Sequence, residues 1–199
     1  GEPVSPDGKY RLEAVGESDI YVSGLRPPEA LRLVDEAGNI LWEDQGWLEQ
    51  EVRWSPDSRY AAIYTAARTW GAITAVDTRN GTAYAVKLPD GSAFGEYVLL
   101  DEMRWVEVDT DRYALWFLLS DGERTEGYRY MPVSQMSFAQ TTTILEGEYD
   151  FDRDGVMELL ELDTIHDGTP LYYEIRVVEE GETIWMDDAY PAHTGWNSL

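Results

Sequence analysis

Ser5-Pro6-Asp7-Gly8-Lys9-Tyr10 recurs 50 positions later as Ser55-Pro56-Asp57-Ser58-Arg59-Tyr60. Each copy precedes a run rich in apolar and β-branched residues, and each run leads to a polar turn, at residues 35–39 and 77–81. A repeat of this length matches one small antiparallel sheet, and Asn80-Gly81 is a strong hairpin signal. The repeat therefore predicts an all-β chain of antiparallel, blade-like sheets.

Two weaker copies follow the first two. Arg104-Trp105 matches Arg53-Trp54 and precedes the apolar run at residues 114–119. A fourth unit begins near Thr141 and continues to a hairpin turn at Glu180-Gly181. The sequence thus predicts about four units, each formed of strand, acidic turn, strand, hairpin and strand.

The best helix candidate, residues 28–35, occupies a strand position in the repeat, so we predict a strand there. Residues 133–143 are polar and follow a proline, which indicates a linker. We therefore expect three blade-like repeats over residues 1–132 and a fourth β unit over residues 133–199. The two parts are expected to pack together as one domain.

The repeated turn is similar to the acidic turn of WD40-like propellers of the TolB type, where it joins the first two strands of a blade. The resemblance covers about residues 3–131. It implies a propeller-like fold, although such propellers usually have more blades than four. A four-bladed ring, an open fan of sheets and a blade-derived sandwich all stay open.

Asp7 and Asp57 of these turns have a structural explanation. A turn aspartate accepts hydrogen bonds from the backbone of its own turn. We expect this role for both residues, and no ligand role.

The second motif is an acidic loop at residues 150–161. Carboxylates stand at loop positions 1, 3, 5, 9 and 12, with Gly155 at position 6: Asp150, Asp152, Asp154, Glu158 and Glu161. Calcium takes six to eight hard oxygen ligands, and the glycine lets the chain reverse so that alternate acids converge. The backbone carbonyl of Val156 is a further candidate ligand.

The residues before this loop decide its type. Residues 141–149 are β-branched and contain Gly147, which favours a strand over the helix that an EF-hand needs. The loop resembles the calcium hairpins of FG-GAP and VCBS repeats over about residues 146–165. This resemblance implies that Asp150, Asp152, Asp154, the Val156 carbonyl and Glu158 hold the ion, with Glu161 as a substitute for Glu158. The alternative is a solvated turn in an acidic protein.

Charge limits the partners. The chain has 39 acidic and 15 basic residues, a formal charge of −24, which repels nucleic acids and anionic membranes and attracts cations. No stretch reaches the about 20 apolar residues of a membrane-spanning helix. The start Gly1-Glu-Pro predicts that a signal or lipoprotein leader is removed, so we expect an extracellular or cell-surface protein. We expect no insertion into the membrane. A lipid anchor on the precursor is one way in which the protein could be held at the surface.

Catalytic motifs are weak. The chain has no cysteine, no Gly-x-Ser-x-Gly elbow and only two histidines, His166 and His193. No catalytic or cofactor-binding residue is predicted. The sequence favours a non-catalytic protein with a structural calcium ion that binds a protein or glycan. The alternative is a glycoside hydrolase that uses paired carboxylates.

The C-terminal residues 190–199 are aromatic and rich in turn formers. We expect them to close the array against the first unit, because Trp185 sits in a strand pattern and should face inward. The alternative is a sugar-stacking platform of Trp185, Tyr190 and Trp196.

Overall fold

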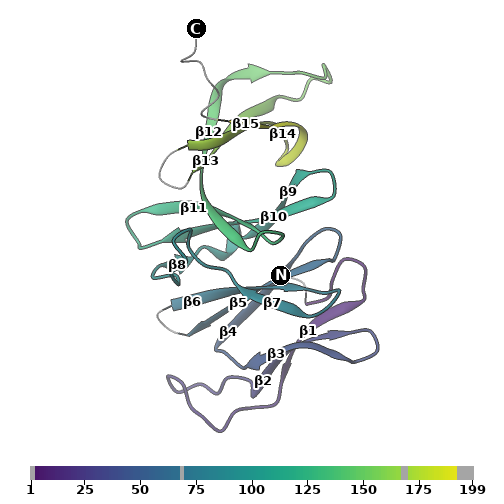
Figure 1. Ribbon diagram of the computed structural model, residues 1–199, viewed down its shortest axis with the longest axis vertical. Helices are drawn as coiled ribbons and strands as arrows, with labels where there is room; N and C mark the ends of the chain where they lie inside the picture. Colours follow the sequence, from purple (N-terminus) through teal and green to yellow (C-terminus); the bar gives the residue numbers. More distant parts are fainter. Residues whose placement is uncertain (1–2, 68–69, 167–169, 192–199) are drawn as a thin grey trace. The chain divides into compact units, whose positions relative to one another are not determined.

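The computed structural model describes residues 3–67, 70–166 and 170–191, and the regular secondary structure in these ranges is almost entirely β-strand (Figure 1). The strands β1–β15 pair antiparallel, and one short 3-10 turn, η1 (Leu100–Glu102), is the only helical element in these ranges. The predicted all-β, antiparallel fold is therefore confirmed. The chain divides into two compact units, Gly1–Ser137 and Phe138–Leu199, here called unit 1 and unit 2.

The first sheet of unit 1 contains β1 (Tyr10–Val15), β2 (Ala30–Asp35) and β3 (Ile40–Gln45), in that order. The strand predicted at residues 28–35 is β2, so its place in the repeat outweighed its helix-forming residues. Val4 pairs with Arg11 in an isolated bridge ahead of β1. The acidic turn therefore joins a short strand stub to β1.

The second sheet is a four-stranded meander of β4 (Glu49–Trp54), β5 (Tyr60–Ala67), β6 (Trp70–Asp77) and β7 (Thr82–Ala85). The central strand β5 is buried on both faces. Alternate side chains of a strand point to opposite faces, so a strand covered on both sides is apolar without alternation. The sequence Tyr-Ala-Ala-Ile-Tyr-Thr-Ala-Ala of β5 fits this rule.

A hydrophobic core joins the first two sheets. Its buried members come from β2, β4, β5 and β6: Leu31, Leu33, Val52, Ala61, Ile63 and Val76. Burying a large aliphatic side chain stabilises a fold by about 1.5–3 kcal/mol. This shared core holds the first blade against the second.

Gly81, in the turn from β6 to β7, also lies against the first sheet. Its φ is +71°, and a Cβ added to it would lie 2.3 Å from the carbonyl oxygen of Leu41 in β3. Only glycine permits both this backbone conformation and this close approach.

The third sheet surrounds β10 (Arg112–Ser120), which pairs with β8 (Tyr97–Val98), β9 (Arg104–Asp109) and β11 (Thr125–Met131). Trp105 of β9 stacks on Tyr60 with ring centroids 5.5 Å apart. Its indole N–H donates to the carbonyl of Arg53 at 2.8 Å. Trp105 thus connects the second and third sheets.

The match between Arg53-Trp54 and Arg104-Trp105 is not a structural equivalence. Trp54 pairs with Ala61, directly beside the acidic turn. Trp105 pairs with Leu115, further from the shorter turn that joins β9 to β10. The third unit therefore repeats the strand order of the second but not its register.

The two acidic turns have the same internal hydrogen bonds. In the first, Asp7 Oδ1 accepts from the Ser5 hydroxyl at 2.7 Å and from the backbone N–H of Lys9 at 3.0 Å. The second copy has the same pair of bonds on Asp57, at 2.6 and 3.1 Å. The structural role predicted for both aspartates is confirmed.

Ser58 links the two turns to each other. It replaces the Gly8 of the first copy and keeps the left-handed backbone, with φ of +60° against +76° for Gly8. Its buried hydroxyl accepts a hydrogen bond from the backbone N–H of Asp7 at 3.0 Å. The serine therefore adds an interaction between blades that a glycine lacks.

Replacing Ser58 by alanine is expected to destabilise the protein by about 1–2 kcal/mol. The variant loses one hydrogen bond and keeps the left-handed strain. Ser58→Gly loses the same bond but relieves the strain. Its free energy of unfolding, measured by urea denaturation, should therefore lie between those of Ser58→Ala and the unchanged protein. Equal stability of Ser58→Ala and the unchanged protein would contradict the proposed link.

Unit 2 is built mainly from one meander of β12 (Met136–Tyr149), β13 (Glu158–His166), β14 (Pro170–Glu179) and β15 (Glu182–Pro191). Glu180 and Gly181, with φ of +47° and +88°, form the predicted turn between β14 and β15. Residues 133–143 were predicted as a linker, but most of this segment belongs to β12. The boundary between the two units, after Ser137, lies within the segment.

A buried charged network lies on one face of this sheet. Asp163 has no exposed surface, and its Oδ2 lies 2.7 Å from Nε of Arg176. Arg176 Nη2 also donates to Glu161 Oε2 at 2.9 Å, and the hydroxyl of Thr142 donates to Asp163 Oδ1 at 2.6 Å. One arginine therefore neutralises two carboxylates from the neighbouring strand.

The expectation for Trp185 was wrong. Its side chain is 51% exposed, although it lies in β15. Among the described strands it pairs only with β14, and the pattern of β15 did not show which face is covered. Residues 192–199, which include His193 and Trp196, lie outside the described part of the chain. The side chain of Tyr190 lies outside it too.

Candidate metal centre

The acidic loop joins two antiparallel strands. β12 and β13 pair up to Tyr149 and Glu158, and residues 150–157 form the connection. The flanking structure is strand on both sides, as the β-branched residues of 141–149 predicted. The loop is therefore a hairpin and has no EF-hand helices.

Backbone N–H groups fold the loop around its own carboxylates. Asp152 Oδ1 accepts from the N–H of Asp154 at 3.1 Å, and Asp150 Oδ2 accepts from that of Gly155 at 3.2 Å. Asp154 Oδ1 accepts from the N–H of Val156 at 2.7 Å. Gly155 has φ of +91°, which lets the chain reverse at this point.

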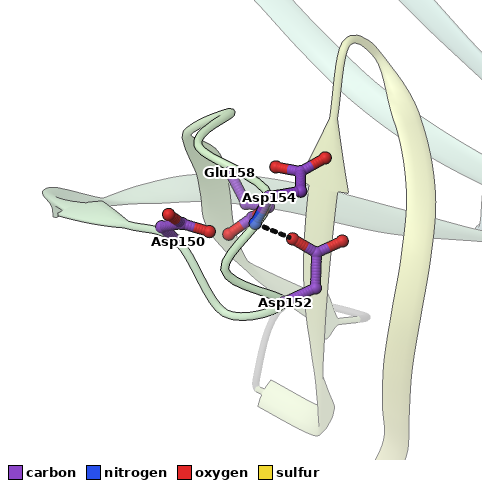
Figure 2. A group of neighbouring side chains, drawn as sticks. All are labelled: Asp150, Asp152, Asp154 and Glu158. Carbon is purple, nitrogen blue, oxygen red and sulfur yellow. Dashed lines mark hydrogen bonds between the residues drawn. The ribbon is translucent and has the colours of Figure 1, made fainter.

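Four predicted ligands come together in this loop. Figure 2 shows their side chains, and the dashed line marks the bond from the Asp154 N–H to Asp152. One carboxylate oxygen from each residue lies within 4.8 Å of the others: Asp150, Asp152, Asp154 and Glu158. Calcium–oxygen distances are about 2.3–2.6 Å, so oxygens on opposite sides of one ion are about 5 Å apart. The spacing fits a shared calcium ion.

Glu158 has an oxygen that lacks a hydrogen bond. The residue is 1% exposed, and its Oε2 accepts from the backbone N–H of Phe151 at 2.7 Å. Its Oε1 is buried and has no hydrogen-bond partner among the described residues, and the same holds for Oδ1 of Asp150. Buried carboxylate oxygens without partners are costly, and a cation at this position removes that cost.

The sequence also predicted Glu161 and the Val156 carbonyl as ligands. Glu161 lies outside the group of four acids, because its carboxylate pairs with Arg176 on β14. The N–H of Val156 donates to Asp154. The ligand role of the Val156 carbonyl stays a prediction.

Glu179 is a fifth acid beside the loop that the sequence did not indicate. It is the last residue of β14, next to Val178, which pairs with Leu159 of β13. Burial raises the pKa of Glu179, and repulsion from Asp154, Asp152 and Glu158 raises it further. Its Oε2 is also buried without a hydrogen-bond partner in the described part of the chain. Only the register of β13 and β14 reveals this neighbour.

Comparisons with known proteins find one similar structure and no related sequence. No protein-family model matches the sequence, and a search of curated proteins finds no match. One similar solved structure is of a protein assigned as TolB from Agrobacterium tumefaciens, at 15% sequence identity and a TM-score of 0.36. The alignment covers 94% of this chain and 64% of that one, so the chain spans less than two thirds of that protein.

A membrane-spanning helix is also absent from the described residues, where no helix has the length and hydropathy to cross a bilayer.

Proposed function

We propose that the loop at residues 150–157 binds one calcium ion and that the ion stabilises the sheet of unit 2. Asp150, Asp152, Asp154 and Glu158 supply side-chain oxygens, and the carbonyl of Val156 supplies a further ligand. The loop would then function as the calcium hairpins of FG-GAP and VCBS repeats do.

The observation that carries this proposal is the buried Oε1 of Glu158. Exposed acidic turns are common in a chain with a net charge of −24, and they need no ion. A bound ion accounts for a glutamate that is 1% exposed, with one oxygen unpartnered among the described residues and three aspartates nearby. Glu179 adds a further negative charge to the same place.

Calcium fits this loop better than magnesium. Magnesium prefers a strict octahedron at about 2.0–2.1 Å and retains much of its water. Calcium accepts more ligands in irregular geometry, which suits a flexible loop with four carboxylates and a backbone carbonyl.

Calcium is expected to raise the melting temperature of the protein relative to a chelator. Free calcium at about 100 times its Kd stabilises by about 2.7 kcal/mol, a shift of about 5–10 °C for a chain of this length. Calorimetry with calcium, with magnesium and with EDTA measures the shift. An equal melting temperature in calcium and EDTA would contradict the proposal.

Glu158→Gln sharpens this experiment, because its effect on the melting temperature is expected to differ between calcium and EDTA. In calcium the variant loses a ligand and should melt lower than the unchanged protein. In EDTA it removes one of several repelling charges, while the amide oxygen of the new side chain can still accept from Phe151, so it should melt at the same temperature or higher. The matched control is Glu148→Gln, an exposed glutamate outside the cluster, which should leave the calcium shift intact.

We further propose that the protein is a non-catalytic binding module for a protein or glycan, in an extracellular or cell-surface location. Calcium sites of extracellular modules have Kd values of about 10⁻⁴–10⁻³ M, which suits an ion with a structural role. The high negative charge disfavours nucleic acid as a partner.

The glycoside-hydrolase alternative gains no support from the most acidic pocket described. That hollow, about 470 Å³ in volume, is lined by Glu29, Glu43 and Asp44 among others. Glu43 pairs with Arg32. Asp44 accepts from the backbone N–H of Gln45 and from the indole of Trp47. Two of the three carboxylates are thus already held by structural contacts.

A further inference from the structure

A second pocket lies within unit 1, between the sheet of β4–β7 and the end of β11. Its volume is about 240 Å³, below the about 300–1,000 Å³ of pockets that take drug-sized ligands. Its polar lining comes from β5–β7, their turns and the residues around the end of β11, and includes Arg59, Asp77, Asn80, Tyr84, Tyr130 and Gln135. We call it the Tyr130 pocket.

Tyr130 has a buried hydroxyl without a partner. The residue is 1% exposed, and its hydroxyl makes no hydrogen bond to any described residue. Burial, and then the nearby Tyr84 and Tyr60, raise the pKa of Tyr130 to about 12. The hydroxyl therefore keeps its proton at neutral pH and can both donate and accept.

Arg59 offers a second unused group to the same pocket. Its guanidinium lies over the ring of Tyr60, 4.8 Å from the centroid, and its Nη2 is 3.6 Å from Asp77 Oδ2. Its Nε–H is buried and has no hydrogen-bond partner among the residues described. A ligand hydroxyl could accept from Arg59 and exchange a hydrogen bond with Tyr130.

The charges of the lining cancel. Asp77 is flanked by Arg59 and by Arg79, whose Nε lies 3.8 Å away, so neither a free cation site nor a free anion site remains among the described residues of the lining. Asn80 and Gln135 add amide groups that both donate and accept. Tyr84 is 38% exposed and offers an aromatic ring. An uncharged ligand with several hydroxyl groups and an apolar ring face matches this set.

We propose that the Tyr130 pocket binds a neutral sugar ring, as a free monosaccharide or as the end residue of a glycan. This inference rests on the binding role proposed above and names its ligand class. It is independent of the calcium site, because every residue of the lining belongs to unit 1.

The protein is titrated with glucose, galactose, mannose and N-acetylglucosamine. Saturation-transfer NMR and calorimetry measure the binding of each sugar. We expect at least one sugar to bind with a Kd on the order of 1 mM, as befits a ligand of about a dozen heavy atoms. Tyr130→Phe should weaken binding about tenfold, because it removes one hydrogen bond. The same variant should melt no lower than the unchanged protein when no sugar is present.

Tyr128→Phe is the matched control on the same strand. The Tyr128 hydroxyl donates to Glu126 at 2.8 Å and lies outside the pocket lining. Its loss should lower the melting temperature and leave sugar binding unchanged.

Three results would overturn the proposal. The first is that none of the four sugars binds, and the second is that Tyr130→Phe binds sugar as tightly as the unchanged protein. The third is a lower melting temperature of Tyr130→Phe without sugar, which would assign an ordered water to the hydroxyl. Sugar titrations in calcium and in EDTA separate this outcome from the calcium proposal. A failed calcium shift leaves the Tyr130→Phe comparison valid, and a failed sugar titration leaves the Glu158→Gln comparison valid.

Discussion

Asp163→Ala is expected to destabilise the folded protein by about 3–5 kcal/mol, because it leaves a buried arginine with too little compensating charge. Arg176 is only 8% exposed, and Asp163 is fully buried against it. Glu161 contacts a different nitrogen of Arg176 and does not replace the lost oxygen at Nε. Urea denaturation followed by circular dichroism measures the loss.

The double variant Asp163→Leu, Arg176→Met tests whether the loss comes from unpaired charge. Replacing both members of a buried pair by apolar residues of similar size is often neutral or stabilising. We expect the double variant to recover most of the stability that Asp163→Ala loses, since the partly exposed Glu161 can be solvated by water. A double variant as unstable as Asp163→Ala would show that the network is needed for packing itself.

Gly81→Ala is expected to have the second largest effect, about 3 kcal/mol or more. Holding alanine at a φ of +71° costs about 1–2 kcal/mol. The new Cβ would also lie 2.3 Å from the Leu41 carbonyl oxygen, so the first and second sheets must move apart and lose packing in their shared core. Thermal and urea unfolding both report the change.

Gly38→Ala separates these two costs. Gly38 has a φ of +84°, similar to Gly81, but a Cβ added there meets nothing within 4 Å. We expect only the backbone cost of about 1–2 kcal/mol for this variant. If both alanine variants lose the same free energy of unfolding, the close approach of Gly81 to Leu41 does not contribute to the loss of stability.

Local patterns allowed much of this fold to be predicted from sequence. The acidic turns depend on hydrogen bonds between residues two to five positions apart, so the sequence Ser-Pro-Asp contains all the information. The same holds for the acidic loop, in which Asp150, Asp152 and Asp154 accept from backbone groups two to five residues away. Strand residues on both sides of the loop then distinguished a hairpin from an EF-hand.

Features that depend on strand register were missed. Glu161 satisfies the loop spacing, yet its carboxylate pairs with Arg176 across the sheet and lies outside the group of four acids. Glu179 comes close enough to be repelled by these acids only because β14 lies beside β13. The Tyr130 pocket combines residues from positions 59 to 135, and no short motif connects them.

The interactions between blades in unit 1 also suggest an order of folding. Each sheet is made of hairpins between neighbouring segments, whereas the bonds from Asp7 to Ser58 and from Trp105 to Arg53 join residues 51 and 52 positions apart. Contacts of high sequence separation pay a larger chain-closure entropy and tend to form late. Hairpins should therefore assemble first, and docking of finished sheets should be the slow step. Stability gained at Ser58 or Trp105 would then act mainly by slowing unfolding.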